Sequence, residues 1–487
     1  MIHPYPARQR RHCCALCIVS TIAFVATCEA PWCPLPNALF MHQNPTTFTL
    51  WHQRSNMGSF QFSEPQLVGE SNTASNTHFW MPGVGGLVAI GPPGNQSLLL
   101  NVDVNGDGTR PIDCEAVQCP PKNYIAAGAA RGGAPWVGQP NMTSVPTNAL
   151  IRMTNPNASS ASFFRGFEGV RLDSSNASGC IAYADWMFHE GTTHQAKAQR
   201  GEKCAPLRGL PRMASGALQL MPSGGTLADG TRLAMGYGAV YNATLTPGAT
   251  AAPGNGYSSF LFASADDGAS WAVRHRFAAT ALMPSAVGCG GWSPPTMGVC
   301  GPCEPAFTVL NDGRTVLAML RIQSAQNLWQ AVSRDGGVTF SDAVETAAWS
   351  VFPQLRTLRN GAVVLASGRP AIGMWQFDAH TLEWGGFRNL AAAHNAALSP
   401  AAPKDYAFDA PEAAVANRSS PVTAPALTKA YMALEALTCE SGSSVCSVVV
   451  AYDRLANGNG VPPGPNGLKD RVFTMRVEVT TALRTHI

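Results

Sequence analysis

Two cysteines are spaced as in a thiol–disulfide redox site. The motif Cys300-Gly-Pro-Cys303 carries out redox chemistry when it lies at a helix N-terminus within a strand–helix–strand unit. Here the motif directly precedes a predicted strand that begins at Glu304. With Cys289 upstream, we interpret the pair as part of a disulfide or a loop staple. No further ligand has the spacing that a zinc site requires.

Two other motifs resemble metal sites only in part. His189-Glu-Gly-Thr-Thr-His194 places its histidines five residues apart, and such side chains do not share a helix face as residues four apart do. Asp103-Val-Asn-Gly-Asp107 begins like a calcium loop, but Cys114 occupies the position of the bidentate glutamate. An Asx-rich turn is the favoured interpretation and a calcium site the alternative. The sequence therefore predicts no metal and no cofactor.

The composition restricts the class of protein. Of 487 residues, 47 are Gly and 37 are Pro, 45% are hydrophobic and only 13% are charged. Disordered chains have the opposite balance, and long helical proteins need far more helix formers. A net charge of +3 gives no basic stripe, so nucleic acid is not a predicted partner. The composition predicts a turn-rich, all-β globular protein.

Residues 1–30 are predicted to be a secretory signal peptide. Basic residues lie at 8–11, an apolar stretch covers 13–27, and Cys28-Glu-Ala30 provides small residues for cleavage. An uncleaved signal anchor is the alternative, although the apolar stretch is short for a membrane span. Apart from that alternative, no membrane interaction is predicted. The signal indicates a secreted protein or one of the secretory-pathway lumen.

The cysteines and glycosylation sequons agree with this route. Removal of residues 1–30 takes four of the 14 cysteines and leaves an even number. Short-range pairs suit disulfides in an oxidising compartment; they are Cys114 with Cys119, Cys180 with Cys204, and Cys439 with Cys446. Six Asn-x-Ser/Thr sequons predict a glycoprotein; they begin at Asn95, Asn141, Asn157, Asn176, Asn242 and Asn417.

One kind of hairpin turn recurs along the chain. Asp229-Gly230, Asp312-Gly313 and Asn360-Gly361 each precede an apolar run with the character of a strand. A Gly-Asn-Gln turn at 94–96 resembles a fourth copy. Each of these turns is expected to join two antiparallel strands.

A second repeat has the pattern Ser-x-Asp-x-Gly-x-x-aromatic. It occurs at 264–271 and 333–340, and 377–384 keeps only the Asp and the aromatic residue. In such a turn the Asp accepts hydrogen bonds from turn amides, the Gly takes a positive φ, and the aromatic ring packs under the next strand.

Repeated units of four short strands predict a six-bladed β-propeller. The six candidate blades cover about 77–110, 148–190, 212–275, 304–345, 352–388 and 425–480. The predicted domains are the signal peptide (1–30), an N-terminal extension (31–76) and a single propeller (77–487). Two β-sandwiches are the alternative, but they would not explain the repeated turn.

The Ser-x-Asp-x-Gly-x-x-Trp turn is the Asp box, and with it the chain resembles the sialidase superfamily of six-bladed propellers. Cys303-Glu304-Pro305 through Arg321 is similar to the family's Asn-Glu-Pro strand pair. The resemblance implies that Glu304 lies beside a nucleophilic Tyr and that Arg321 binds the substrate carboxylate. The resemblance covers most of residues 77–480.

The last predicted blade supplies the nucleophile. Ala430-Tyr431, followed by Tyr452-Asp453-Arg454, resembles the last sialidase blade, in which a Tyr begins one strand and a Tyr-Glu pair ends the next. Tyr431 matches the nucleophile, and Asp453 stands where the family has Glu. A phenol needs a carboxylate to take its proton, and a neutral Tyr avoids charge repulsion from an anionic sugar.

The remaining site candidates match the family less closely. Arg369 is a predicted second carboxylate ligand, because a guanidinium can bind a carboxylate with two hydrogen bonds. Arg454 and Arg212 are lesser candidates for the same role. Trp80 stands where sialidases have the first Arg of their carboxylate-binding triad. The acid/base is expected among three aspartates, Asp103, Asp107 and Asp113.

The resemblance implies an exo-glycosidase that removes sialic acid or a related acidic sugar from a glycan or glycoconjugate. Tyr431 would be the nucleophile and Glu304 its base, with Arg321 and Arg369 as carboxylate ligands. The departure at Trp80 leaves a second hypothesis, a non-catalytic glycan-binding propeller. A propeller that mediates structural or protein interactions is the third.

Overall fold

The computed structural model divides the chain into two compact units, Met1–Thr47 and Phe48–Ile487. All the residues that the structure describes belong to the second unit; they are 58–71, 79–80, 86–90, 96–104, 123–126, 135–138, 160–164, 170–173, 178–188, 196–198, 203–213, 218–240, 257–278, 301–322, 327–349, 351–368, 371–379, 381–409, 428, 430–456 and 469–481.

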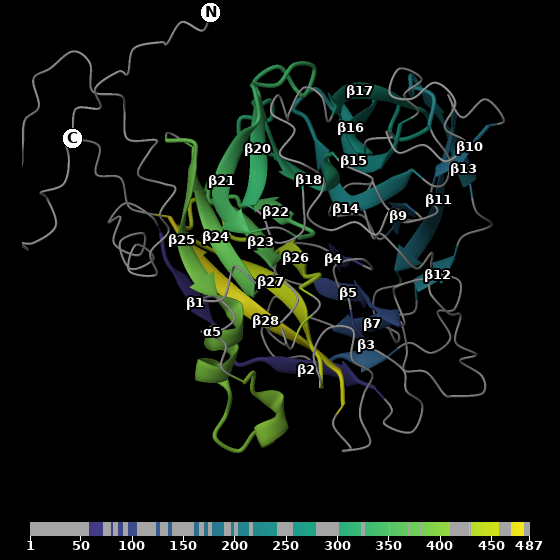
Figure 1. Cartoon of the computed structure of the whole chain (residues 1–487). Helices are drawn as coiled ribbons and strands as arrows, with labels where there is room; N and C mark the ends of the chain where they lie inside the picture. The colour runs from purple at the N-terminus through teal and green to yellow at the C-terminus, as the bar shows by residue number, and fades with distance from the viewer. Residues whose placement is uncertain are drawn as a thin grey trace, which may run out of the picture. The chain divides into compact units, whose positions relative to one another are not determined.

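The described part of this unit consists almost entirely of β-strands, which confirms the predicted all-β class (Figure 1). The sheet β4–β5–β7–β8 has the strands Leu87–Ile90, Ser97–Asn101, Asn123–Ala126 and Val137–Gly138. The sheet β18–β21 has the strands Cys303–Val309, Val316–Arg321, Asn327–Ser333 and Val344–Trp349. The sheet β22–β25 has the strands Gln354–Thr357, Val363–Gly368, Ile372–Asp378 and Glu383–Asn389. Each of these sheets is antiparallel, with neighbours in chain order paired.

Nine strands form a single larger sheet. Strands β9–β17 are Ser160–Phe164, Val170–Leu172, Gly179–Phe188, Ala196–Ala198, Lys203–Arg208, Gln219–Thr226, Arg232–Ala239, Tyr257–Ser264 and Trp271–Ala278. The segments predicted as the second and third blades are therefore not separate sheets. Their outer strands β13 and β17 pair in parallel, with Leu207 opposite Trp271.

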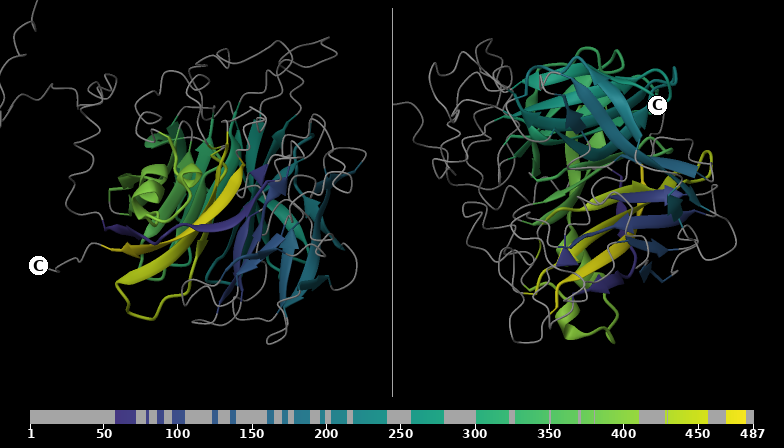
Figure 2. Two further views of the ribbon diagram at one scale, coloured as in Figure 1. Left: turned by 90° about the horizontal axis from the view of Figure 1, so that it is seen from below. Right: turned by 90° about the vertical axis from the view of Figure 1, so that its right-hand side faces the viewer.

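The last sheet combines strands from both ends of the unit. Strands β26–β28 are Ala433–Ala436, Val445–Arg454 and Arg471–Thr480. β28 also pairs with β1 (Phe60–Phe62) and β2 (Gln66–Glu70). The segment predicted as an N-terminal extension, 31–76, thus contributes two strands to this sheet. Figure 2 shows β1 and β2 (purple) running beside β28 (yellow).

Edge strands of different sheets lie next to one another. β14 contacts β18, β18 contacts β22, β22 contacts β26, and β26 contacts β4. A short pair, β3 (Phe79–Trp80) with β6 (Asp103–Val104), lies against β27 and β28. Residues at the ends of these edge strands are therefore brought together although they are far apart in sequence.

The three predicted Asx-Gly hairpins are confirmed. They join β14 to β15, β18 to β19 and β22 to β23. Gly230, Gly313 and Gly361 have φ values of +86°, +66° and +88°, in the left-handed region that glycine adopts without a steric penalty. Asp312 Oδ1 accepts the amide hydrogens of Arg314 and Thr315 at 2.9 and 2.8 Å. Local sequence therefore sets the strand register next to each of these three turns.

The two predicted Asp-box turns share one hydrogen-bond pattern. Ser333 Oγ donates to Asp335 Oδ1 at 2.7 Å and accepts the amide hydrogen of Gly337 at 2.7 Å. The hydroxyl and amide of Thr339 donate to Asp335, and these bonds hold the pKa of its carboxyl below the usual range. The turn at Asp266 repeats the arrangement, as the spacing predicts.

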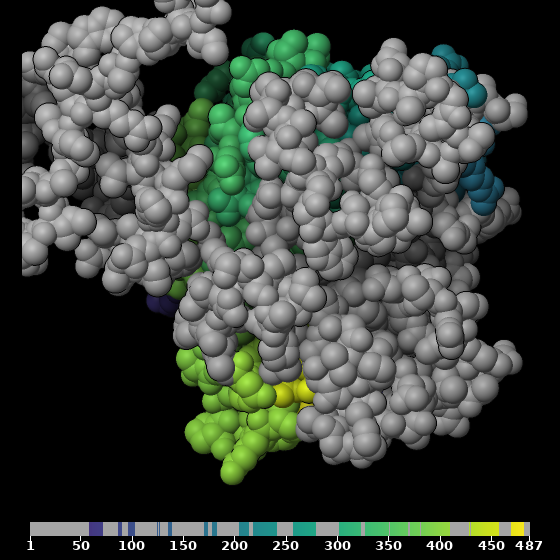
Figure 3. Space-filling model, viewed as in Figure 1, coloured from purple at the N-terminus to yellow at the C-terminus, as the bar shows by residue number. Residues whose placement is uncertain are grey.

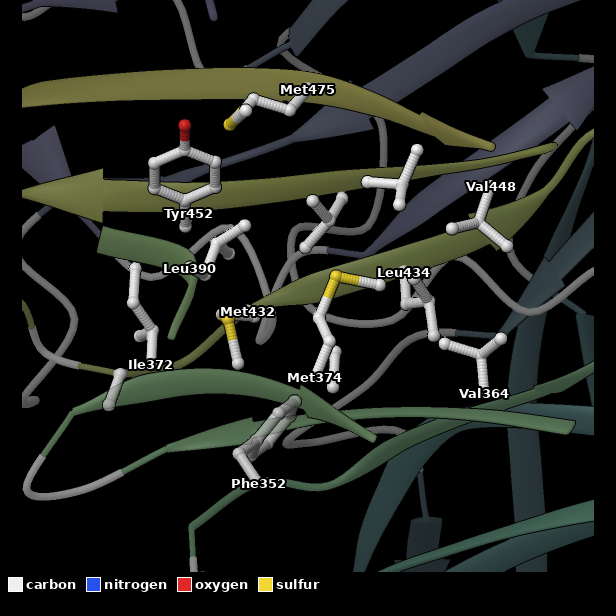
Figure 4. Packing of buried hydrophobic residues seen from close by; sticks show 14 of the residues in the cluster. Phe352, Val364, Ile372, Met374, Leu390, Met432, Leu434, Val448, Tyr452 and Met475 are labelled. Carbon is white, nitrogen blue, oxygen red and sulfur yellow. The ribbon is translucent and has the colours of Figure 1, made fainter. Parts of the chain in front are cut away.

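The largest buried cluster lies between β22–β25 and the last sheet (Figure 4). Burying one such side chain contributes about 1.5–3 kcal/mol. The labelled members of the cluster are Phe352, Val364, Ile372, Met374, Leu390, Met432, Leu434, Val448, Tyr452 and Met475.

A helical segment follows β25 and packs on this cluster. Helix α5 (Leu390–Ala397) begins after Asn389, whose side chain accepts the amide hydrogen of Ala392 at 3.2 Å. A short 3-10 helix, η4 (Lys404–Tyr406), completes the segment. The space-filling view shows the segment on the molecular surface (Figure 3). No helix in the described ranges is both long and apolar enough to span a membrane.

His394 links α5 to the last sheet by a side-chain hydrogen bond. The Tyr406 carbonyl can only accept, so His394 Nε2 carries the hydrogen and donates it at 3.1 Å. A neutral imidazole has one N–H, so Nδ1 accepts the hydroxyl hydrogen of Tyr452 at 2.7 Å. Burial, assisted by the charge of Arg454 and opposed by the hydrogen bond to the Tyr406 carbonyl, lowers the pKa of His394 to about 4. The ring is therefore neutral at physiological pH.

Acidification is expected to destabilise the protein through His394. The unfolded chain takes up a proton near pH 6.5, whereas the folded protein does so only near pH 4. The contribution of the neutral His394 to the free energy of unfolding is fully present above pH 6.5 and falls by about 3 kcal/mol as the pH drops to 4. Urea denaturation of the natural protein and of His394→Gln across this pH range measures this loss. An identical pH dependence in the two proteins would contradict the assignment.

Two of the predicted disulfides are confirmed, Cys180–Cys204 and Cys439–Cys446. Cys303 has a free thiol, so the disulfide interpretation is wrong at this cysteine. The signal peptide, the Cys114–Cys119 pair and the six sequons lie outside the described residues.

Candidate functional site

Glu304 and Tyr431 meet although 127 residues separate them. Glu304 lies near the start of β18, and Tyr431 lies just before β26. The Tyr431 hydroxyl donates to Glu304 Oε1 at 3.0 Å. A carboxylate at this distance can accept the phenolic proton directly.

Arg321 forms an ion pair with the same carboxylate. It ends β19 and lies opposite Cys303 in the β18–β19 register, so the hairpin at Asp312-Gly313 brings it beside Glu304. Its Nη1 contacts Glu304 Oε2, and both side chains are nearly buried. Burial alone would lower the pKa of Arg321, but the charge of Glu304, the neighbouring Cys303 and Tyr431, and the hydrogen bond to Glu304 together outweigh burial and raise it. Arg321 is therefore a fixed positive charge at the site.

Phe352 holds both members of the Glu304–Tyr431 pair. It follows β21 and precedes β22, and its amide hydrogen donates to Glu304 Oε2 at 3.2 Å. Its ring packs against the Tyr431 ring, with centroids 5.0 Å apart. Ser367 Oγ lies 2.7 and 2.9 Å from the carbonyls of Trp349 and Val351, which anchors this turn. Glu304 thus has hydrogen-bonding partners at both carboxylate oxygens.

Backbone strain is concentrated at the same place. Glu304, Phe352 and Ala430 have φ values of +41°, +44° and +66°, in a region that L-residues rarely adopt. They are three of the five non-glycine residues with positive φ in the described ranges; the others are Asp267 and Leu382. Each such residue costs about 1–3 kcal/mol and persists where the surroundings enforce it, commonly at functional sites.

Two neighbours of the pair, Cys303 and Tyr237, are kept neutral by burial. Burial raises the pKa of the Cys303 thiol to about 12, so this cysteine is neutral and unsuited to redox chemistry. Burial, followed by the charge of Glu304, raises the pKa of Tyr237, whose ring packs edge-on against Tyr257 at 5.4 Å. Because water is largely excluded, the charges of Glu304 and Arg321 act over a low dielectric.

The two other predicted arginines that the structure describes, Arg212 and Arg454, do not share this arrangement. Arg212 is exposed, between β13 and β14. Arg454 ends β27, is buried, and donates from Nε to the carbonyl of Ala407 at 2.9 Å, so it anchors the segment after α5. Arg369 lies outside the described residues.

The predicted acid/base region is described only in part. The backbone of Asp103 pairs with that of Trp80 across β3 and β6. Asp107 and Asp113 lie outside the described residues. Among the described side chains, no group of three or more His, Cys, Asp or Glu could hold a metal ion.

The sequence did not point to Phe352, Thr428 or the role of Asp453. Phe352 acts through its backbone amide, which no side-chain pattern reveals. Thr428 and Asp453 form a hydrogen bond across 25 residues, between a segment before β26 and the end of β27. Tyr452, predicted as part of the Tyr-Asp pair, faces the buried cluster and binds His394.

Comparison with known proteins found no matching family model and no matching curated protein. Among solved structures, a protein of unknown function from Dyadobacter fermentans is similar at 14% identity and a TM-score of 0.42, covering 86% of this chain and 99% of that one. The NanB sialidase of Streptococcus pneumoniae is similar at 10% identity and a TM-score of 0.40, covering 86% and 71%.

A mutant of Trypanosoma rangeli sialidase displaying trans-sialidase activity is similar at 10% identity and a TM-score of 0.37. That match covers 87% of this chain and 57% of the other. TM-scores this low do not establish a shared fold or activity.

Proposed function

We propose that this chain is a six-bladed, sialidase-like β-propeller. The sheets β4–β5–β7–β8, β18–β21, β22–β25 and β26–β28 would each be one blade, and the nine-stranded sheet would comprise two blades joined through β13 and β17. The sequential contacts of β14, β18, β22, β26 and β4 support this assignment, because propeller blades place their first strands around a common axis. The pairing of β1 and β2 with β28 would close the ring.

The proposed activity is that of an exo-glycosidase acting on sialic acid or a related acidic sugar at the end of a glycan. The hydrogen bond from Tyr431 to Glu304, inside a strained and buried site, is the observation that carries this proposal. A phenol that acts as a nucleophile requires a base within hydrogen-bonding distance, and the Glu304 carboxylate meets this requirement.

In the proposed reaction the Tyr431 oxygen attacks the anomeric carbon while its proton passes to Glu304. The bond from the anomeric carbon to the leaving oxygen breaks, and an aspartate of the 103–113 region protonates that oxygen. The aspartate then takes a proton from a water molecule, whose oxygen attacks the anomeric carbon. The glycosyl–tyrosine bond breaks and the Tyr431 oxygen regains its proton from Glu304, which regenerates the enzyme. Arg321, with Arg369 as second ligand, would hold the sugar carboxylate, because guanidinium groups bind carboxylates with directed hydrogen bonds.

A panel of methylumbelliferyl glycosides tests this function. The purified protein is expected to release the fluorophore from the sialic acid glycoside and not from the matched neutral hexosides, since Arg321 supplies a fixed positive charge. Absence of turnover on every acidic glycoside of the panel would contradict the proposal.

A non-catalytic glycan-binding propeller is the second candidate, favoured by Trp80 in the place of the family's first arginine. It predicts saturable binding to sialylated glycans on an array without hydrolysis. We also propose a secreted or lumenal location, which the two disulfides support.

A further inference from the structure

The turn that carries Tyr431 has an unfavourable backbone conformation. Ala430 directly precedes Tyr431, is 1% exposed and has a φ of +66°. The left-handed region is unfavourable for alanine, whereas glycine or asparagine would adopt it at a lower cost. Contacts from elsewhere in the fold must therefore hold this turn and, with it, the position of the Tyr431 ring.

A two-step hydrogen-bond chain provides such contacts. The Thr428 hydroxyl accepts the amide hydrogen of Ala430 at 2.9 Å and lies 2.9 Å from Asp453 Oδ1. An amide can only donate, and a hydroxyl has one hydrogen, so Thr428 donates that hydrogen to Asp453. Thr428 and Asp453 are 5% and 0% exposed, so water does not compete for these bonds.

We propose that Thr428 and Asp453 are positioning residues for Tyr431. Asp453 lies near the end of β27, a strand fixed by ten register pairs to β28, and therefore offers a rigid reference point. Through the Thr428 hydroxyl it fixes the Ala430 amide, and thereby keeps the Tyr431 hydroxyl within hydrogen-bonding distance of Glu304. The expected effect on catalysis rests on the proposed function. The expected effect on the position of Tyr431 does not, since that position can be measured without turnover.

Thr428→Val removes the hydroxyl at nearly constant volume, and Thr428→Ser retains it. The valine variant is expected to lower kcat about 10- to 100-fold, because small misplacements of reacting groups have effects of that size. KM is expected to stay within about twofold, since neither residue contacts the sugar in this account. The serine variant is expected to stay within about threefold of the natural protein.

Thr346 offers a matched control. Its hydroxyl makes the same pattern of bonds on β21, accepting the amide hydrogen of Ala348 at 3.2 Å and donating to the carbonyl of Leu328 at 2.8 Å. Thr346→Val should lower the melting temperature and leave kcat unchanged. Equal effects of Thr428→Val and Thr346→Val on kcat would overturn the proposal.

A second measurement needs no turnover. Fluorine NMR of protein labelled with 3-fluorotyrosine reports the Tyr431 environment, with its signal assigned by loss in Tyr431→Phe. Thr428→Val should shift or broaden this signal, while Thr346→Val and Thr428→Ser should not. An unchanged signal in Thr428→Val overturns the positioning role even if the protein is a glycosidase. If the Tyr431 signal shifts in Thr428→Val but the natural protein shows no turnover, the positioning role is supported and only the proposed function is contradicted.

Discussion

Replacing Tyr431 with phenylalanine is expected to lower kcat on a sialic acid glycoside by about a thousandfold or more. The change removes only the hydroxyl, which donates to Glu304 at 3.0 Å, and leaves the ring packed against Phe352. The loss of one buried hydrogen bond to a charged group should cost about 1.5–3 kcal/mol of stability. The measurement is steady-state kinetics together with urea denaturation.

Tyr452→Phe is the matched control for this experiment. Tyr452 also loses one buried hydroxyl bond, to His394 Nδ1 at 2.7 Å, but it faces the core cluster. It should lose stability and keep its activity. If Tyr431→Phe retained most of the activity of the natural protein, Tyr431 would not be the nucleophile.

Glu304→Gln is expected to produce the second large effect, on both rate and stability. Without the carboxylate the Tyr431 proton has no base, and kcat should fall by about 100- to 10,000-fold. The Arg321 charge also loses its partner in a nearly buried site, which should cost about 3–5 kcal/mol. Kinetics and denaturant unfolding of the variant measure the two effects.

Three further variants separate the effects on rate and on stability. Arg321→Met should be destabilising alone, and the double variant with Glu304→Gln should lose less stability than the sum, because the two side chains are paired. Glu435→Gln breaks another ion pair, Arg356 Nε to Glu435 Oε2 at 2.9 Å, between β22 and β26. It should reduce stability without a large effect on kcat. Additive losses for Glu304 and Arg321 would contradict the coupling.

The features predicted from sequence are those that depend on short-range contacts. The Asx-Gly hairpins and Asp-box turns each depend on hydrogen bonds within a few residues, so their motifs were sufficient. The proximity of Glu304 and Arg321 also follows from one hairpin register. Tyr431 was named by family resemblance, and its distance to Glu304 depends on the packing of different sheets.

The features that the sequence did not reveal depend on pairing between distant segments. The parallel pairing of β13 with β17 and the addition of β1 and β2 to the last sheet have no local signal. The Phe352 amide reaches Glu304 across 48 residues through backbone alone. Arg454 was a lesser candidate for a carboxylate ligand, but its Nε binds the carbonyl of Ala407.

Trapping of the covalent intermediate tests the central claim most directly. The protein is incubated with a fluorinated sialic acid analogue whose glycosyl-enzyme hydrolyses slowly, and peptides are then analysed by mass spectrometry. The account predicts one sugar adduct on the peptide that contains Tyr431, and none in Tyr431→Phe. An adduct on another residue, or turnover of sialosides without any adduct, would contradict it.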